Sequence, residues 1–365
     1  MFRTVLTVAA LSLASTSAFA GKSVKSQHYF NIYVKEVKHL YNGLKNYGIN
    51  KTMSYDYANR FVGKNAFGWD MALGTASSNT SFDTTGSWIT QDVQDQWANG
   101  WTGDGVTVGV IDNHKKQLWH KQGKSHGYLV SSVLGGETDG YAGIAPEATI
   151  NKHHYNDLGS IDIASTDIIN ISMGMCSYSN PCNYQSYAYK YWLNQWKPED
   201  SAKGTLFVTS AGNGHGYSHQ DALNNALVKN VYKSSSLVVG AVKDLTTTEW
   251  VGLDDDNNPM FESTTETVLQ YGTKKAGKHK WNFVVDYTDH NWGNGLTLGQ
   301  TSGAAPNVSG KAALMMQKYP ELTAKQTARL IKYTATDLGK KGVDKVYGYG
   351  LVNLSKAMSP FGNIN

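Results

Sequence analysis

Four short, mostly apolar runs recur from residue 106 onward, and they constrain the fold more than any other feature. They are Val106–Ile111, Asp167–Ser172, Leu206–Ala211 and Ser236–Ala241. A strand that is apolar on both sides needs cover on both sides, which is typical of a parallel sheet. Stretches of helical character lie between and after the runs, at residues 128–134, 187–196, 221–228, 308–317 and 324–333. The alternation predicts an α/β domain whose working residues lie at the carboxyl ends of the strands.

Composition and charge exclude several other classes of protein. The chain has 365 residues, of which 40% are hydrophobic and 17% are charged, a balance opposite to that of a disordered chain. The formal net charge is only +4 and no long basic tract accompanies it, so we expect no nucleic-acid partner. After the first 20 residues no apolar segment approaches the length of a spanning helix, so we expect no membrane span in the mature chain.

The N-terminal sequence is that of an exported protein. Arg3 precedes an uncharged apolar run, and Ala18-Phe19-Ala20 forms a small-residue cleavage site, so residues 1–20 are predicted to be a signal peptide. We therefore expect a periplasmic, cell-surface or secreted protein. Residues 21–90 are predicted to be an N-terminal extension, either a pro-segment, an interaction arm or a helix packed on the main domain. The main domain is predicted to span residues 91–359, with a tail at residues 360–365.

Two local features bear on disulfides and metals. Cys176 and Cys182 flank a turn-rich stretch, which in an exported chain predicts a small disulfide loop rather than a metal site or a catalytic thiol. The acidic stretch Asp254–Asn258 has the ligand types for calcium, but its spacing fits no calcium loop. We expect a solvated turn there and no cofactor, with calcium binding as the alternative.

Three polar residues combine into one chemical constellation. Asp112 directly follows the first apolar run, His126 opens an apolar helix in Ser-His-Gly, and Ser302 lies at a predicted helix entrance whose first turn holds Pro306. A serine hydroxyl becomes a nucleophile when a base takes its proton and an acid orients that base. The Asn213 side chain, after the third run, and the backbone N–H of Ser302 offer donors for an oxyanion. The other histidines near Asp112 precede no glycine and apolar helix, so we do not expect His114 or His120 to be the base.

These segments resemble those of the subtilisin-like serine proteases, the subtilases. The matching segments are Val-Gly-Val-Ile-Asp112, Ser-His126-Gly, Ser-Ala-Gly-Asn213, Gly143-Ile-Ala-Pro146, Gly-Gln-Thr-Ser302-Gly-Ala-Ala-Pro-Asn-Val-Ser-Gly and Gly348-Tyr-Gly-Leu-Val-Asn353. The order Asp, His, Ser is that of subtilisin. The resemblance covers residues 90 to 359 and implies a three-layer subtilisin-like α/β fold, a mostly parallel central sheet flanked by helices.

The resemblance also implies how a peptide substrate is held, and four segments of this chain differ from the family pattern. An extended substrate would pair with the segment Ser172, Met173 and Gly174, and the backbone of Ala211 and Gly212 would flank the pocket for the residue before the cleaved bond. The departures from the family pattern are Asn113-His114 after the aspartate, Tyr128-Leu129 after His-Gly, Gly303 in place of methionine, and Asn307 in place of histidine.

We expect a secreted serine endopeptidase that cleaves a polypeptide substrate through an acyl-enzyme. We also expect the protein to be a monomer. Two alternatives stay open. One is a catalytically weak or inactive subtilase scaffold that acts as a binding or regulatory protein. The other is a serine hydrolase that cuts a different bond, such as an ester.

Overall fold

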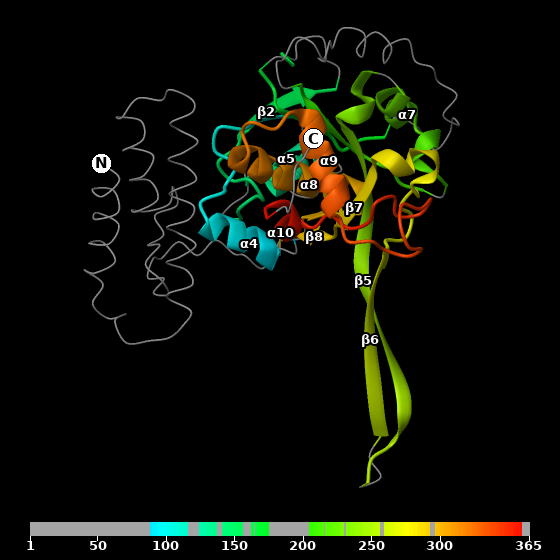
Figure 1. The fold of residues 1–365 in the computed structure, drawn as a ribbon. Helices are drawn as coiled ribbons and strands as arrows, with labels where there is room; N and C mark the ends of the chain where they lie inside the picture. The colour runs from blue at the N-terminus through cyan, green and yellow to red at the C-terminus, as the bar shows by residue number, and fades with distance from the viewer. Residues whose placement is uncertain are drawn as a thin grey trace, which may run out of the picture. The chain divides into compact units, whose positions relative to one another are not determined.

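A mostly parallel sheet forms the centre of the computed structural model (Figure 1). The structure describes residues 88–115, 124–136, 141–155, 162–163, 165–174, 204–214, 216–229, 231–255, 259–292 and 296–359, all within one compact unit, Thr80–Asn365. Its main strands are β1 (Thr107–Asp112), β2 (Thr149–His154), β3 (Ile168–Ile171), β4 (Leu206–Ser210), β5 (Ser236–Leu253), β6 (Pro259–Leu269) and β7 (Phe283–Tyr287). Among the described residues no helix is both long and apolar enough to cross a membrane.

The sheet runs in the order β2-β1-β3-β4-β5-β6, and β7 also pairs with β5. All pairs are parallel except β5 with β6, which are antiparallel. The carboxyl ends of β1, β3 and β4 therefore meet at one edge. Smaller elements complete the fold: α4 (Gln91–Ala98), η4 (Ser218–Gln220), η5 (Val231–Ser234), η6 (Gly277–Asn282), β8 (His290–Asn291), β9 (Thr297–Leu298) and α10 (Leu354–Ala357).

Side chains alternate across the sheet into two apolar layers. Val108 and Val110 of β1 face the cluster that includes helices α5 (His126–Gly135), α8 (Gln300–Lys318) and α9 (Ala324–Thr334). Ile111 faces the opposite cluster, with residues of α7 (Ala222–Lys229). Burial of β1 on both faces explains why its sequence is a nearly unbroken apolar run. The predicted three-layer α/β fold is confirmed.

Helix α8 begins earlier than the sequence suggested. Gln300, its first residue, has a left-handed φ of 57°, so the chain turns sharply from Gly299 into the helix. The prediction that Pro306 lies in the first turn is wrong, because it is the seventh residue of the helix. A proline there has no N–H for the carbonyl four residues before, which is that of Ser302. The helix tolerates this because it is buried along most of its length.

Other predictions differ in extent or fall outside the described residues. The run Ser236–Ala241 continues as β5 to Leu253 and returns as β6, a hairpin that was not predicted. Strands β2 and β7 were also not predicted. The predicted signal peptide, residues 21–87 of the extension, His120, Cys176 and Cys182, the helix at 187–196 and the tail lie outside the described residues, so they stay predictions.

Trp88, near the end of the predicted extension, lies in the core. It is 1% exposed, and its indole N–H donates to the Ala142 carbonyl at 3.0 Å. Its ring lies 4.9 Å from that of Trp292 and meets His290 edge-on at 5.1 Å, centroid to centroid. The following residue, Ile89, is also buried. The packed unit therefore includes residues just before position 91.

We predict that Trp88→Ala lowers the free energy of unfolding by about 3–5 kcal/mol, because a large buried ring is replaced by a cavity. Urea denaturation of the full chain measures this change. Tyr271→Ala is the matched control, because that ring is 80% exposed and its loss should cost less than about 0.5 kcal/mol. Equal effects of the two substitutions would contradict the packing of Trp88.

Candidate active site

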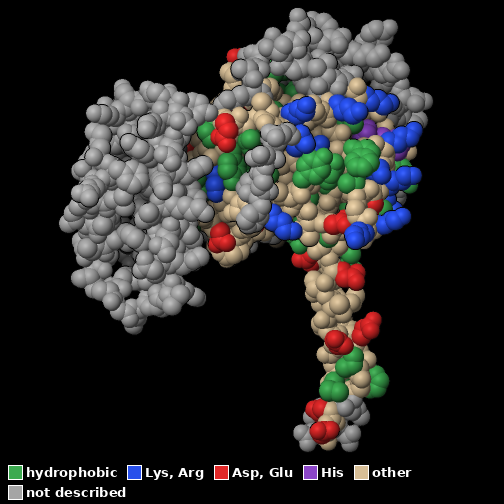
Figure 2. All heavy atoms as spheres, in the orientation of Figure 1, with side chains coloured by type: hydrophobic (Ala, Val, Ile, Leu, Met, Phe, Trp, Pro, Cys, Tyr) green, Lys and Arg blue, Asp and Glu red, His purple; other side chains and the backbone are tan. Residues whose placement is uncertain are grey.

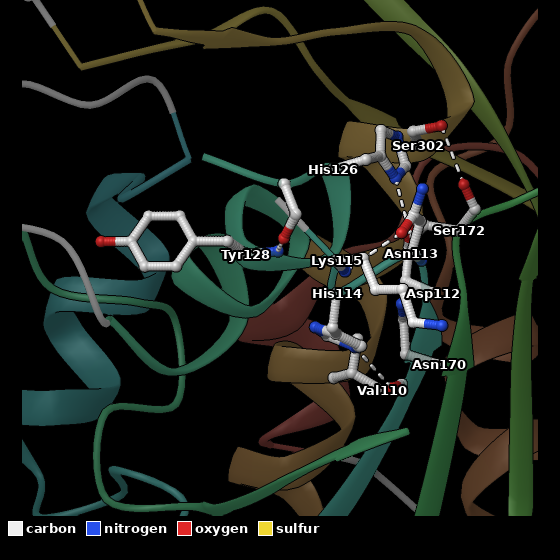
Figure 3. Close-up of polar contacts among 11 residues, drawn as sticks. Val110, Asp112, Asn113, His114, Lys115, His126, Tyr128, Asn170, Ser172 and Ser302 are labelled. Carbon is white, nitrogen blue, oxygen red and sulfur yellow. Dashed lines mark hydrogen bonds and ion pairs between the residues drawn. The ribbon is translucent and has the colours of Figure 1, made fainter. Parts of the chain in front are cut away.

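The ends of β1 and α5 bring an acid and a base together. Asp112 is the last residue of β1 and is 1% exposed, whereas His126 is the first residue of α5. The Ser125 hydroxyl accepts a hydrogen bond from the Tyr128 N–H at 3.1 Å, which caps the helix and fixes its start. His126 Nδ1 lies 2.7 Å from Asp112 Oδ1 (Figure 3). The carboxylate therefore orients the ring and holds a proton on Nδ1.

The electrostatics of the pair favour a protonated ring. Burial by itself would lower the pKa of His126, but the hydrogen bond and the negative charge of Asp112 outweigh it and raise the pKa above 6.5. The Asn113 backbone N–H donates to the same Asp112 oxygen at 2.6 Å. The other oxygen, Oδ2, is buried without a hydrogen-bond partner among the described residues. The His126 side chain is 28% exposed, which leaves part of the ring accessible.

Ser302 is the third residue of α8. Its hydroxyl donates to the Ser172 carbonyl at 2.9 Å, directly after β3. Figure 3 shows the His126 ring between the Asp112 carboxylate and the side chain of Ser302.

Thr301 orients the side chain of Asn213, a role that the sequence did not reveal. The Thr301 hydroxyl and backbone N–H both donate to Asn213 Oδ1, at 2.8 and 3.2 Å. Because the amide oxygen is held by two donors, the NH₂ group is left to face away from Thr301. Thr301 precedes Ser302 in the motif, which is the only signal in the sequence for its role.

The five predicted substrate-binding residues follow the ends of β3 and β4. Ser172 is buried, Met173 is half-buried and Gly174 is exposed, whereas Ala211 and Gly212 are both buried. Their role in holding a peptide stays a prediction.

Lys274 was not predicted, and it lies beside this segment. Its backbone N–H donates to the Gly212 carbonyl at 3.1 Å. Its Cδ, Cε and Nζ atoms lie 3.2–3.5 Å from where a Cβ on Gly212 would stand. The lysine is 8% exposed, so a largely buried cation lies next to Gly212.

The packing around two of the residues that depart from the family pattern is close. The first is His114, whose ring lies 2.6 Å from where a Cβ on Gly127 would stand and whose Nε2 is 3.0 Å from the Val110 carbonyl. The second departure is Gly303, because a Cβ there would lie 2.7 Å from the Thr288 hydroxyl and 3.0 Å from the His290 ring. His114 therefore packs behind the Asp112–His126 pair, and Gly303 makes room for its neighbours.

His290 supports α8 as a neutral ring. Burial lowers its pKa to about 4, so in the folded protein Nε2–H donates to the Gly303 carbonyl at 3.1 Å. That carbonyl belongs to the residue after Ser302. Trp88 packs against the other side of His290, which connects the start of the packed unit to this helix.

Among the described residues no group of three histidines, cysteines or carboxylates is placed to hold a metal ion. Asp254 and Asp255 follow the exposed end of β5, and residues 256–258 are outside the described part of the chain. The calcium question is therefore not tested.

We predict that Asp112→Asn lowers the pKa of His126, because burial then acts without the opposing carboxylate charge. In the wild type, protonated His126 contributes to the free energy of unfolding because its pKa is raised in the folded state. This contribution is fully present below pH 6.5 and is lost as the pH rises through the folded-state pKa. An NMR titration of the ring protons measures both pKa values. His219 is the internal control, because its pKa is lowered by partial burial and by Lys278 and should not change. An unchanged His126 titration would contradict the electrostatic role of Asp112.

Several known proteases are similar to this chain in sequence. An extracellular serine protease of Serratia marcescens is 25% identical over 368 aligned positions, which cover 75% of this chain and 34% of that protein. Subtilisin DY of Bacillus licheniformis is 27% identical over 292 positions, covering 71% of this chain and 93% of that protein. The chain spans about a third of the length of the Serratia relative.

A solved structure and a family model complete the comparison. The structure described as the basis of subtilase cytotoxin SubAB assembly is similar in fold, with a TM-score of 0.50 and 18% identity, covering 74% of this chain and 92% of that one. The model of the subtilase family matches residues 104–350. The matched residues span most of the chain and hold the whole candidate site, so this chain belongs to the subtilase family.

Proposed function

We propose that this protein is an exported serine endopeptidase in which Asp112, His126 and Ser302 act as a catalytic triad. The observation that carries the proposal is the 2.7 Å hydrogen bond between His126 and the buried Asp112, at the sheet edge where the first turn of α8 holds Ser302. Family membership and the names of the secreted relatives support a serine peptidase outside the cytoplasm. The signal-like residues 1–20 supply the route of export.

In the proposed reaction His126 accepts the proton of Ser302 as its oxygen attacks the scissile carbonyl carbon. The tetrahedral oxyanion is held by the Asn213 NH₂ group and the Ser302 backbone N–H. His126 then gives its proton to the leaving amine, and an acyl-enzyme remains. Water, activated by the same ring, releases the acid product. Asp112 stays ionised and stabilises the imidazolium in both steps.

A weak or inactive scaffold is the alternative, and two contacts favour it. One oxygen of Asp112 has no hydrogen-bond partner among the described residues, and the Ser302 hydroxyl donates to a carbonyl rather than to His126. Neither contact removes a triad atom. The alternative therefore predicts slow hydrolysis or none in a folded protein.

We predict that Ser302→Ala abolishes casein hydrolysis and labelling by a fluorophosphonate probe while unfolding stays unchanged. In subtilisin itself, loss of this serine costs about 10⁶-fold in kcat. Ser263→Ala, on an exposed strand, is the matched control and should keep both signals. A folded wild-type protein that neither cleaves casein nor takes the probe would support the inactive scaffold. Labelling without casein cleavage would point to another acyl bond, such as an ester.

We further predict a preference for an acidic residue on the amino side of the cleaved bond. The cation of Lys274 lies beside Gly212, in the segment proposed to flank that pocket. A peptide with Glu there should have a kcat/KM about tenfold above that of its Gln counterpart, about 1.4 kcal/mol in transition-state energy. Lys274→Met should bring the ratio close to one.

Lys275→Met is the matched control for this preference. It removes the same charge from the adjacent residue, whose side chain is exposed, and should leave the Glu-to-Gln ratio unchanged. Equal cleavage of both peptides by the wild type would contradict the role of Lys274 but not the peptidase activity.

A further inference from the structure

Strands β5 and β6 continue beyond the sheet as an exposed hairpin, residues 243–268, which we call the arm (Figure 1). Up to Val242 the strand β5 is buried, and from Lys243 to Val251 every residue is exposed. Five of the nine large hydrophobic side chains exposed in the described residues belong to the arm: Leu245, Trp250, Val251, Met260 and Phe261. A two-stranded hairpin with bare apolar side chains is at best marginally stable by itself.

The two strands of the arm pair without interruption from Lys243 to Trp250, and a bulge at Val251 breaks the register near the far end. On one face of the arm, hydrogen bonds between hydroxyl groups join the two strands. They connect Thr246 with Thr265 and Thr248 with Ser263, each at 2.9 Å. The same face ends in the opposed rings of Trp250 and Phe261. At about 3.4 Å per residue, Trp250 lies about 27 Å beyond Val242. The end of the arm therefore lies far from its own sheet (Figure 1).

The other face of the arm carries an unfavourable pair of charges. Glu249 and Glu262 are directly opposite in the ladder, and neither makes an ion pair with a described residue. Like charges at opposed positions destabilise a hairpin. The end of the arm therefore combines exposed aromatic rings with two carboxylates. A surface with exposed aromatic rings and positively charged side chains would be complementary to it.

The main domain carries such a surface on η6 and α9. Trp281 and Tyr333 are 56% and 66% exposed, and both rings meet Tyr349 edge-on, with centroid distances of 6.3 and 5.7 Å. Lys280 lies 4.7 Å from the centre of the Trp281 ring, and Arg329 lies 5.7 Å from that of Tyr333.

Helix periodicity extends this surface. Lys325, Arg329 and Tyr333 follow one another at four-residue intervals on α9, so they share one face. We call the six residues the aromatic–basic patch: Lys280, Trp281, Lys325, Arg329, Tyr333 and Tyr349. Figure 2 shows hydrophobic side chains among lysines and arginines over α9, and acidic and hydrophobic side chains along the arm.

The charges of arm and domain are complementary. The arm holds one lysine and seven acidic residues, a formal charge of −6. The rest of residues 91–365, which includes the patch, holds 23 basic and 18 acidic residues, a formal charge of +5. Opposite charges of this size favour association between two molecules and orient their encounter.

We propose that the arm of one molecule binds the aromatic–basic patch of a second copy of this chain, and that the two copies do so reciprocally. Trp250 and Phe261 would pack on Trp281 and Tyr333, while Glu249 and Glu262 would meet Lys280, Lys325 and Arg329. A two-fold arrangement uses each arm and each patch once, so the assembly closes as a dimer. This differs from the monomer expected from the sequence, and it does not depend on the proposed peptidase activity.

Analytical ultracentrifugation of the full chain, carrying Ser302→Ala to prevent self-cleavage, tests the proposal over about two decades of protomer concentration. We expect a monomer–dimer equilibrium at about 0.1 M salt that shifts toward monomer at about 1 M, where charges are screened within about 3 Å. Trp250→Ser with Phe261→Ser should weaken the dimer at least tenfold. Tyr271→Ser is the matched control, because it removes an exposed ring outside both surfaces.

Charge reversal gives the decisive comparison. Glu249→Lys with Glu262→Lys keeps a like-charged pair in the hairpin but should abolish self-association, as should Lys280→Glu with Lys325→Glu on the patch. Mixing these two variants should restore a mixed dimer, because a reversed arm then meets a reversed patch. Circular dichroism confirms that each variant is folded. A wild type that stays monomeric, a dimer insensitive to both reversals, or an arm that binds only a different protein would overturn the proposal.

Discussion

The buried ion pair between Lys311 and Asp286 fixes α8 against the sheet, and the position of Ser302 depends on it. The ammonium lies 2.9 Å from both carboxylate oxygens, and the two side chains are 4% and 0% exposed. Loss of one partner from such a pair leaves a buried charge uncompensated, which costs about 3–5 kcal/mol. Asn307, on the same helix, also donates to the Tyr287 carbonyl at 3.0 Å. Directional bonds of this kind prevent the helix from sliding along the sheet, as apolar contacts alone would not.

The parallel sheet could be predicted from the sequence because burial on both faces leaves a distinct apolar run. The arm could not be predicted, since Thr246–Thr248 and Ser263–Thr265 are hydroxyl residues without apolar alternation, which is typical of a solvated loop. The edge strand β2 was missed for the same reason, because most of its residues are at least partly exposed. Whether a solvent-facing segment forms a strand depends on the strand it pairs with. The pattern of apolar residues along the sequence does not reveal that pairing.

The positions of Asp112, His126, Asn213 and Ser302 could be predicted because each lies in a short motif with its own local structure. Their supporting contacts could not. Thr301 lies 88 residues from Asn213 in the sequence, and nothing local connects them. No local motif marks His114, yet its ring packs against Gly127. Such contacts depend on tertiary packing, so only the folded chain reveals them.

The separations between the bonded residues of the site also set an order of assembly. His126 and Asp112 are 14 residues apart, whereas Ser302 and its partner Ser172 are 130 apart. Closing the longer loop costs more chain entropy, and contacts between distant residues form late in folding. A chain that emerges from its amino end therefore contains both Asp112 and His126 well before Ser302 is made. Under the proposed triad, the growing chain lacks, for most of its synthesis, the group that would cut it.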